Sequence, residues 1–118
     1  LRQYDVSDPF SPRLTGAARL GGIISRAPHA KAGPLNGGPQ MVEVSRDGRR
    51  VYLTNSLYAS WDAQFYPEGI NGWLAKIDAD QDGGITVDPE FLVRFEGERP
   101  HQVRLEGGDA SSDSYCYP

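Results

Sequence analysis

Residues 41–55 have the sequence MVEVSRDGRRVYLTN, in which two apolar alternating runs flank a turn. The runs Met41–Val44 and 51–55 have the β-rich composition and the period of two that are typical of strands. Asp47-Gly48 between them is a strong hairpin signal, because glycine readily adopts the positive φ that such turns need. This stretch therefore predicts two adjacent antiparallel strands.

The rest of the chain adds further strand signals and almost no helix signal. No window of about 11 residues keeps the apolar spacing of a helix without a Gly or Pro in it. Further strand candidates are residues 1–6, 13–20, 73–77, 91–95 and 101–105. The total of about seven or eight short strands predicts an all-β protein. Such a set fits two four-stranded blades of a β-propeller and equally a small β-sandwich, and periodicity does not choose between them.

Composition narrows the classes of partner. The chain has 118 residues, a net charge of −4 and 12 scattered Lys and Arg residues, so we expect no nucleic-acid partner. No window approaches the roughly 18 apolar residues of a membrane span. The single cysteine, Cys116, excludes an intrachain disulfide, and we expect it to be an exposed free thiol.

Two segments are predicted to be long loops. Residues 25–38 are rich in Ala, Gly, Pro and Lys without periodicity, and we expect His29 within them to be solvated. Residues 59–71 form the second expected loop, in which Trp61, Asp62 and Tyr66 stand close together. Aromatic rings with polar ends are typical of a loop pinned to a sheet, and a wall of a substrate pocket is the alternative interpretation.

Residues 78–83 match the beginning of a calcium-binding EF-hand loop, with Asp78, Asp80 and Asp82 at alternate positions. The position of the bidentate Glu is occupied by Pro89, and the flanks are predicted strands rather than helices. We therefore expect an acidic β-turn, and a small calcium-binding β-domain stays the weakest of three functional hypotheses.

Five blocks of sequence together resemble the C-terminal region of the selenium-binding protein/methanethiol oxidase family. They are LRQYDVSDP at 1–9, GGPQM at 37–41, SLYASWDAQFYP at 56–67, FLV at 91–93 and GGDASSD at 107–113. The resemblance implies that residues 1–118 are the C-terminal part of a β-propeller domain, with about two four-stranded blades and the rest missing. Residues 25–38 would be its variable loop and residues 106–118 its C-terminal tail. Open sheet edges would then favour self-association.

The resemblance also implies a chemistry. By this resemblance, we expect the chain to be part of a copper-dependent thiol oxidase that converts methanethiol, dioxygen and water to formaldehyde, hydrogen sulfide and hydrogen peroxide. His101 matches a histidine of the family's C-terminal block and is implied as one copper ligand, with the other ligands upstream of Leu1. Without the resemblance, a lone His at the start of a strand is more typical of a hydrogen-bonded edge residue. We assign no catalytic acid, base or nucleophile, and we expect the chain alone to be inactive.

A non-catalytic propeller that binds selenium or thiols, or that serves as a scaffold for a protein partner, is the alternative function. Ala110 favours it slightly, because many family members carry Cys at this position. Family members occur in the cytoplasm and in the bacterial periplasm, so the resemblance leaves the compartment open.

Overall fold

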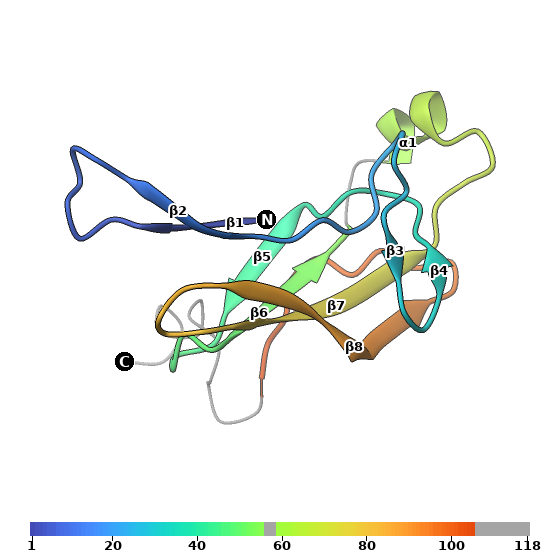
Figure 1. Ribbon diagram of the computed structural model, residues 1–118. Coiled ribbons are helices and arrows are strands. Elements are labelled where there is room, and N and C mark those ends of the chain that lie inside the picture. The colour runs from blue at the N-terminus through green and yellow to red at the C-terminus, as the bar shows by residue number, and fades with distance from the viewer. Residues whose placement is uncertain (56–58, 106–118) are drawn as a thin grey trace.

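The computed structural model describes residues 1–55 and 59–105, and its largest element is one antiparallel sheet. Four strands form this sheet in the order β5-β6-β7-β8, so each strand pairs with its neighbour in the sequence (Figure 1). Their bounds are Met41–Val44 for β5, Arg50–Thr54 for β6, Gly72–Ala79 for β7 and Ile85–Phe95 for β8. The hairpin predicted from residues 41–55 is confirmed, with Met41 opposite Thr54.

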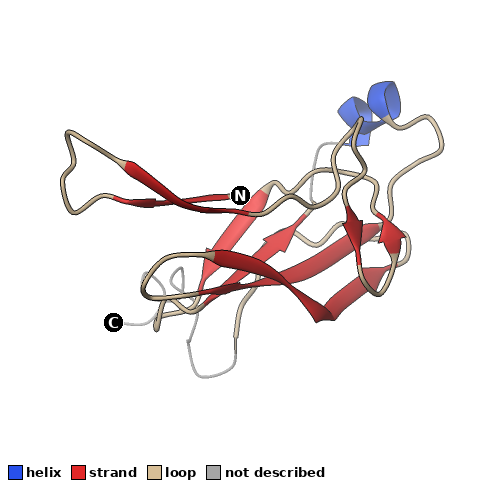
Figure 2. Ribbon diagram, viewed as in Figure 1, coloured by secondary structure: helices blue, strands red, loops and turns tan. Residues whose placement is uncertain are grey.

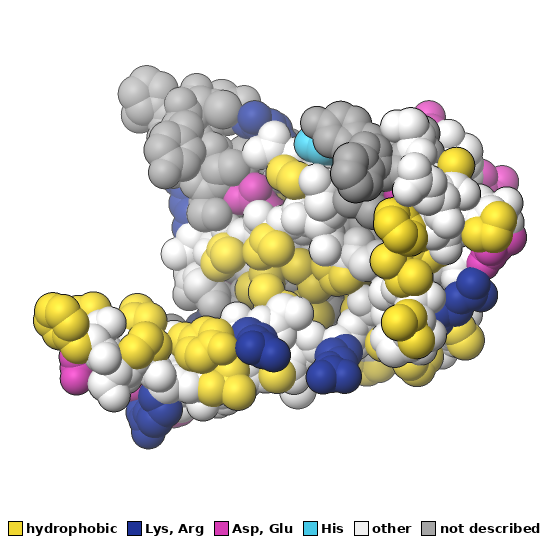
Figure 3. Space-filling model, turned by 90° about the horizontal axis from the view of Figure 1, so that it is seen from above, with side chains coloured by type: hydrophobic (Ala, Val, Ile, Leu, Met, Phe, Trp, Pro, Cys, Tyr) yellow, Lys and Arg dark blue, Asp and Glu magenta, His cyan; other side chains and the backbone are white. Residues whose placement is uncertain are grey.

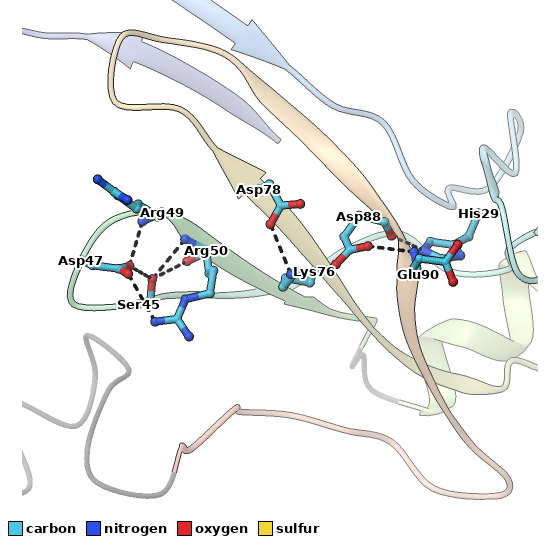
Figure 4. Close-up of polar contacts among 9 residues, drawn as sticks. All are labelled: His29, Ser45, Asp47, Arg49, Arg50, Lys76, Asp78, Asp88 and Glu90. Carbon is cyan, nitrogen blue, oxygen red and sulfur yellow. Dashed lines mark hydrogen bonds and ion pairs between the residues drawn. The ribbon is translucent and has the colours of Figure 1, made fainter.

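The turn between β5 and β6 is closed by side-chain hydrogen bonds and by a glycine. Gly48 has a φ of 71°, a left-handed conformation that other residues rarely adopt. Ser45 Oγ accepts a hydrogen bond from Arg50 N (3.1 Å), and Asp47 Oδ1 accepts from Ser45 Oγ (2.5 Å) and Arg49 N (3.0 Å; Figure 4). The pKa of Asp47 is lowered, mainly by the hydrogen bond from Ser45 and further by the hydrogen bond from Arg49 N, because both favour the charged carboxylate.

The acidic segment after Ile77 forms the turn between β7 and β8. Asp80 Oδ1 accepts a hydrogen bond from Asp82 N (2.9 Å), and Gly83 N donates to Asp80 O (3.2 Å). Both flanks are strands, as the sequence predicts, although β8 already begins at Ile85. The Asp80 carboxylate thus closes its own turn, as expected for an acidic β-turn.

Two smaller sheets accompany the large one. Strands β1 (Arg2–Asp5) and β2 (Arg13–Ala17) form a hairpin that extends away from the body of the molecule (Figure 1). Strands β3 (Pro28–His29) and β4 (Gly33–Pro34) form a short hairpin within the predicted loop 25–38. The all-β class is confirmed (Figure 2). The described residues form one four-stranded sheet and two two-stranded sheets. The place of these sheets in a propeller stays a prediction.

Two predictions about local structure were wrong. Residues 59–71 begin with a helix, α1 (Ala59–Phe65), which at seven residues is too short to give an amphipathic pattern. Residues 101–105 do not form a strand, and one of their contacts is a hydrogen bond from Thr54 Oγ1 to His101 O (3.1 Å). No helix of the described segments is long and apolar enough to cross a membrane.

The hydrophobic core lies against the large sheet. Its buried members are Leu20, Leu35, Val51, Leu53, Trp73, Ala75, Ile77 and Ile85. Leu20 and Leu35 come from the segments on either side of the β3–β4 hairpin, so this irregular region covers the sheet. Side chains from β6, β7 and β8 supply the rest of the core.

His29 is part of this packing, and the expectation of a solvated side chain was wrong. Its side chain is 2% exposed. His29 Nδ1 accepts a hydrogen bond from Lys31 N (3.1 Å), so His29 Nε2, which lies 2.9 Å from Asp88 O, is the donor in that contact. Strands of two residues give no periodic signal, which is why the sequence did not show that β3 packs against β8.

Candidate functional site

An open cleft of about 790 Å³ lies beside helix α1 and is the candidate site. We call it the Asp62 cleft. It is lined by Gly22, Ile23, Ile24, Ser25, Gly38, Pro39, Gln40, Asp62, Phe65 and Tyr66. Three segments that are distant in the sequence therefore meet there. Figure 3 shows hydrophobic side chains on the side of the molecule that carries α1, as well as along the β1–β2 hairpin and in the middle of this face. Ile24 is 96% exposed.

A close crossing of two backbone segments forms one wall of the Asp62 cleft. Gly22 N donates a hydrogen bond to Gly37 O (3.0 Å). A Cβ atom on Gly21 would lie 2.0 Å from Gly37 O, and Gly21 has a φ of 64°, so only glycine fits at this position. The crossing holds residues 22–25 against residues 38–40.

The buried side chain of Asn55 forms hydrogen bonds to the segments next to this crossing. Asn55 is 0% exposed and accepts a hydrogen bond from Trp73 N at its Oδ1 atom (2.7 Å). Its Nδ2 atom donates to Asn71 O (2.9 Å) and to Asn36 O (3.4 Å). Trp73 Nε1 also donates to Asn36 O (2.8 Å), so one carbonyl next to Gly37 is held by two side chains. These bonds fix the segment that leads into the cleft wall.

Asp62 is the charged group of the cleft. It is 3% exposed, and its Oδ2 atom forms an ion pair with Arg99 Nη1. Its Oδ1 atom is buried and has no hydrogen-bond partner in the described structure. Burial of a carboxylate oxygen without a donor is unfavourable, because the oxygen loses its hydrogen bonds to water and forms no hydrogen bond in the protein. The pKa of the neighbouring Tyr66 phenol is raised. Burial is the main cause, and the negative charge of Asp62 acts in the same direction.

Arg99 reaches Asp62 because the chain after β8 runs close along the start of β7. A Cβ atom on Gly72 would lie 2.3 Å from Glu98 O and 2.5 Å from Pro100 Cδ. Glycine at position 72 is therefore required for this approach. The same segment then brings His101 O to Thr54 Oγ1, at the end of β6.

His101, the predicted metal ligand, lies two residues after Arg99 and has an exposed side chain. No group of three His, Cys, Asp or Glu side chains that could hold a metal ion occurs among residues 1–55 and 59–105. The described residues therefore do not form a complete copper site around His101. Its role as a ligand stays a prediction, and Ala110 and Cys116 lie outside the described residues.

The structure brings together some of the predicted features and separates others. Block 37–41 and block 56–67 meet at the Asp62 cleft, with Phe65 half-exposed and Tyr66 buried. The aromatic block thus contributes both to packing and to a cleft wall, and a role of this wall in substrate binding stays a prediction. Its first aromatic residues, Tyr58 and the side chain of Trp61, lie outside what the structure describes. His29 takes no part in the cleft and is bound to β8 instead.

Sequence reasoning did not identify Arg99 or the pair Ile23-Ile24 as members of the site. Arg99 stands among other charged residues, and only the fold shows that it reaches helix α1. Ile23-Ile24 directly follows Gly21-Gly22, and two large apolar residues in a loop were an available signal.

The fold and the cleft define an antiparallel β-sheet protein with an open, mainly apolar cleft that is bordered by Asp62, the partner of Arg99 in an ion pair. The family follows from sequence comparison: the model of the 56 kDa selenium-binding protein family (SBP56) matches residues 1–116, and the chain belongs to this family. The resemblance found in the five sequence blocks is thereby confirmed.

Individual relatives agree with this assignment. The chain is 42% identical over 144 aligned positions to methanethiol oxidase from Homo sapiens, and 39% identical over 139 positions to selenium-binding protein 1 from Arabidopsis thaliana. Both alignments cover 96% of this chain. A solved structure of a hypothetical selenium-binding protein from Sulfolobus tokodaii is 63% identical, with a TM-score of 0.86 over 99% of this chain. The chain spans 28–29% of the length of the two curated relatives and 26% of the solved chain.

Proposed function

We propose that this chain is part of a longer thiol oxidase, and that the oxidase converts methanethiol, dioxygen and water to formaldehyde, hydrogen sulfide and hydrogen peroxide. The observation that carries the proposal is the 42% identity to human methanethiol oxidase over 96% of this chain. Because the chain spans only 29% of that relative, the activity belongs to the longer protein and not to these 118 residues alone.

Two features of the described residues support this proposal. The Asp62 cleft has mainly apolar walls, which suit a substrate that consists of little more than a methyl group and a sulfur atom. His101 has an exposed imidazole, a group that binds copper well. Its position two residues after Arg99 links it along the chain to the Asp62 cleft.

Copper dependence is part of the proposal. A redox-active metal would supply the electron transfer to dioxygen, which no side chain of this chain can perform alone. His101 would be one ligand, and the remaining ligands would come from parts of the longer protein beyond these residues. The described residues do not form the complete site of such a metal.

The test uses the full-length protein and measures copper content and turnover of methanethiol under air. We expect stoichiometric copper and the formation of hydrogen sulfide, formaldehyde and hydrogen peroxide in equal amounts. His101→Ala should lower both the copper content and the turnover. The control is Gln102→Ala, because Gln102 is an exposed neighbour of the same segment.

The outcomes separate the oxidase from a binding protein. Full copper and full turnover in His101→Ala would remove His101 from the metal site. Absence of turnover after reconstitution with copper would overturn the oxidase. A selenium- or thiol-binding scaffold would then take its place, since several relatives carry the name selenium-binding protein.

A further inference from the structure

We infer that a second cavity, which shares no lining residue with the Asp62 cleft, binds a small monocarboxylate. We call it the Arg94 cavity. It has a volume of about 440 Å³, and its charged lining residues are Arg26, Glu68 and Arg94. It lies where the β3–β4 hairpin packs beside β8 (Figure 1). The inference goes beyond the proposed oxidase and does not depend on it.

The first step concerns the direction of Arg94. Arg94 on β8 is the cross-strand partner of Trp73 on β7, and such partners point to the same face of a sheet. Trp73 is 2% exposed and belongs to the core, and Leu92, two positions before Arg94, also packs against the core. Because alternate residues of a strand share a face, Arg94 lies on the core-facing side of the large sheet. At this end of the sheet it borders the cavity.

The second step concerns the partner of Arg94. Within residues 1–55 and 59–105, the side chain of Arg94 forms no hydrogen bond or ion pair. Arginine on the core-facing side of a sheet is usually paired with an acid. A carboxylate bound in the cavity would accept the two parallel N–H···O bonds that the planar guanidinium group favours. We therefore assign Arg94 as the main ligand-binding side chain.

Arg26 lines the same cavity from a fixed backbone. Its φ of 42° is the only positive value of a non-glycine residue in the described part of the chain. Two hydrogen bonds between Gly21 and Ala27, each of 2.8 Å between N and O, hold this conformation. Strained residues persist where their surroundings fix them, and they are frequent at ligand-binding sites. Arg26 Nη2 pairs with Glu68, which leaves other N–H donors of Arg26 for a ligand.

The charge of the cavity selects a monoanion. The two arginines and Glu68 leave one excess positive charge, although the chain as a whole has a net charge of −4. The pKa of Glu68 is lowered, mainly by a hydrogen bond from its own backbone N–H and further by Arg26, so its carboxylate stays charged. One bound carboxylate balances the excess charge. A dianion such as sulfate would leave excess negative charge beside Glu68.

The size and the polar lining of the cavity fit such a ligand. Its volume lies near the lower end of the range for small-molecule sites, roughly 300–1,000 Å³. Two lining residues, Asn36 and Asn71, have backbone carbonyl groups that already accept hydrogen bonds from Asn55 Nδ2. Asn36 O also accepts from Trp73 Nε1. These acceptors are engaged inside the protein, so they oppose an anion less than free carbonyl groups would.

The experiment is a ligand-observed NMR titration of the full-length protein with acetate at constant ionic strength, because salt screens exposed charges. Acetamide, a neutral molecule of similar shape, is titrated in the same way, and sulfate is tested by its displacement of acetate. We expect acetate to bind more tightly than either molecule. In Arg94→Gln it should bind about tenfold more weakly, as the loss of charge-assisted hydrogen bonds predicts. The matched control is Arg19→Gln, which removes the same charge from an exposed position outside the cavity.

A second variant, Glu68→Gln, predicts a gain of binding that a folding defect cannot imitate. It removes the acid that competes for Arg26, so acetate should bind severalfold more tightly. Absence of acetate binding to the wild type, or an affinity that is the same in the wild type and in both cavity variants, would overturn the inference. Equal weakening in Arg94→Gln and Arg19→Gln would also overturn it.

The comparison molecules test the type of ligand. Acetamide that binds as tightly as acetate would overturn the role of charge. Sulfate that displaces acetate at an equal or lower concentration would overturn the choice of a monocarboxylate. None of these measurements involves copper or turnover, so failure of the carboxylate site and failure of the proposed oxidase are distinguishable.

Discussion

Arg99 and Asp62 lie 37 residues apart in the sequence and form an ion pair that connects the segment after β8 to helix α1. The Asp62 side chain is almost fully buried, whereas that of Arg99 is partly exposed. An isolated helix of seven residues is not stable in water, so α1 depends on such contacts for its existence. The ion pair therefore fixes both a short helix and one boundary of the Asp62 cleft.

Removal of Arg99 should destabilise the protein more than removal of a neighbouring arginine. Arg99→Met leaves the Asp62 carboxylate buried without a counter-charge, and we expect a loss of about 2–4 kcal/mol in the free energy of unfolding. Arg94→Met is the control, because Arg94 is an exposed residue on β8 and should change stability by less than about 0.5 kcal/mol. Urea unfolding of the full-length variants measures both values.

The double variant Arg99→Met/Asp62→Asn extends this test. The neutral amide removes the unpaired charge, so part of the stability lost in Arg99→Met should return. Strictly additive losses would mean that the two side chains do not interact in the folded protein.

Gly72 should not tolerate even a methyl group. Gly72→Ala would place a Cβ atom 2.3 Å from Glu98 O, so the segment that bears Arg99 must move. We expect a loss of about 2–3 kcal/mol, which is in the range of other overpacked sites. Gly38→Ala is the matched control, because the nearest atom to its Cβ is Gly22 Cα at 3.9 Å and its φ is not positive. Thermal unfolding compares the two, and equal effects would contradict the close approach at Gly72.

The two histidines should separate into a structural and a chemical role. His29→Ala removes a buried ring with hydrogen bonds to Lys31 N and Asp88 O, so we expect a loss of about 2–3 kcal/mol in stability. Copper content per folded molecule should stay unchanged. In His101→Ala we expect the opposite result: the copper content should fall, and the free energy of unfolding should change little. Loss of copper in a folded His29→Ala variant would count against its assignment to packing alone.

The ion pair between Lys76 and Asp88 should contribute stability only within a window of pH. Lys76 Nζ lies 2.7 Å from Asp88 Oδ2 and 3.3 Å from Asp78 Oδ1 (Figure 4). The bond from Lys76 lowers the pKa of Asp88 below its ordinary value of 3.8, and the bond to Asp88 raises the pKa of Lys76 above 10.5. The ion pair therefore stabilises the folded protein fully between about pH 3.8 and pH 10.5. This stabilisation is lost as the pH falls through the lowered pKa of Asp88. It is also lost as the pH rises through the raised pKa of Lys76.

The variant Asp88→Asn tests this window. The stability difference between wild type and Asp88→Asn should be constant near neutral pH and should shrink below about pH 4, where the unfolded carboxyl takes up a proton. Denaturant unfolding at several pH values measures it. A difference that persists unchanged at pH 2 would assign the effect to packing around β8 and not to charge.

The sequence was informative where a local pattern determined the structure. The hairpin at 41–55 followed from alternation and Asp47-Gly48, and the acidic turn after Ile77 followed from its Asp and Gly residues. Both features are decided by residues within a few positions of one another. Each was therefore visible without knowledge of the rest of the fold.

The parts that the sequence did not show depend on contacts between distant residues. Helix α1 is held by Arg99, and the burial of His29 results from packing against β8. The segment 101–105 alternates like a strand, yet it forms no strand, and Thr54 of β6 donates a side-chain hydrogen bond to His101 O. For the site, the resemblance pointed to block 56–67, but only the fold showed that Asp62 borders a cleft and forms an ion pair with Arg99.

The β1–β2 hairpin is the region most open to association with another chain. Its two strands pair only with each other in the described structure, so each has an outer edge without a strand partner. Phe10, in its turn, is 96% exposed, and the cross-strand pair Tyr4 and Leu14 also presents apolar surface. Unpaired edges beside exposed apolar side chains are typical sites of strand addition.

We therefore predict that the isolated 118-residue chain self-associates through this hairpin. Leu14→Thr keeps a residue that favours strands but removes apolar surface, and Phe10→Ser removes the exposed ring in the turn; each should shift the chain toward monomer. Val93→Thr is the control, because Val93 is a comparably exposed apolar residue on β8, away from the hairpin. Sedimentation velocity over a range of concentrations gives the mass of the species. Association that persists in both hairpin variants and weakens in Val93→Thr would place the contact on the large sheet instead.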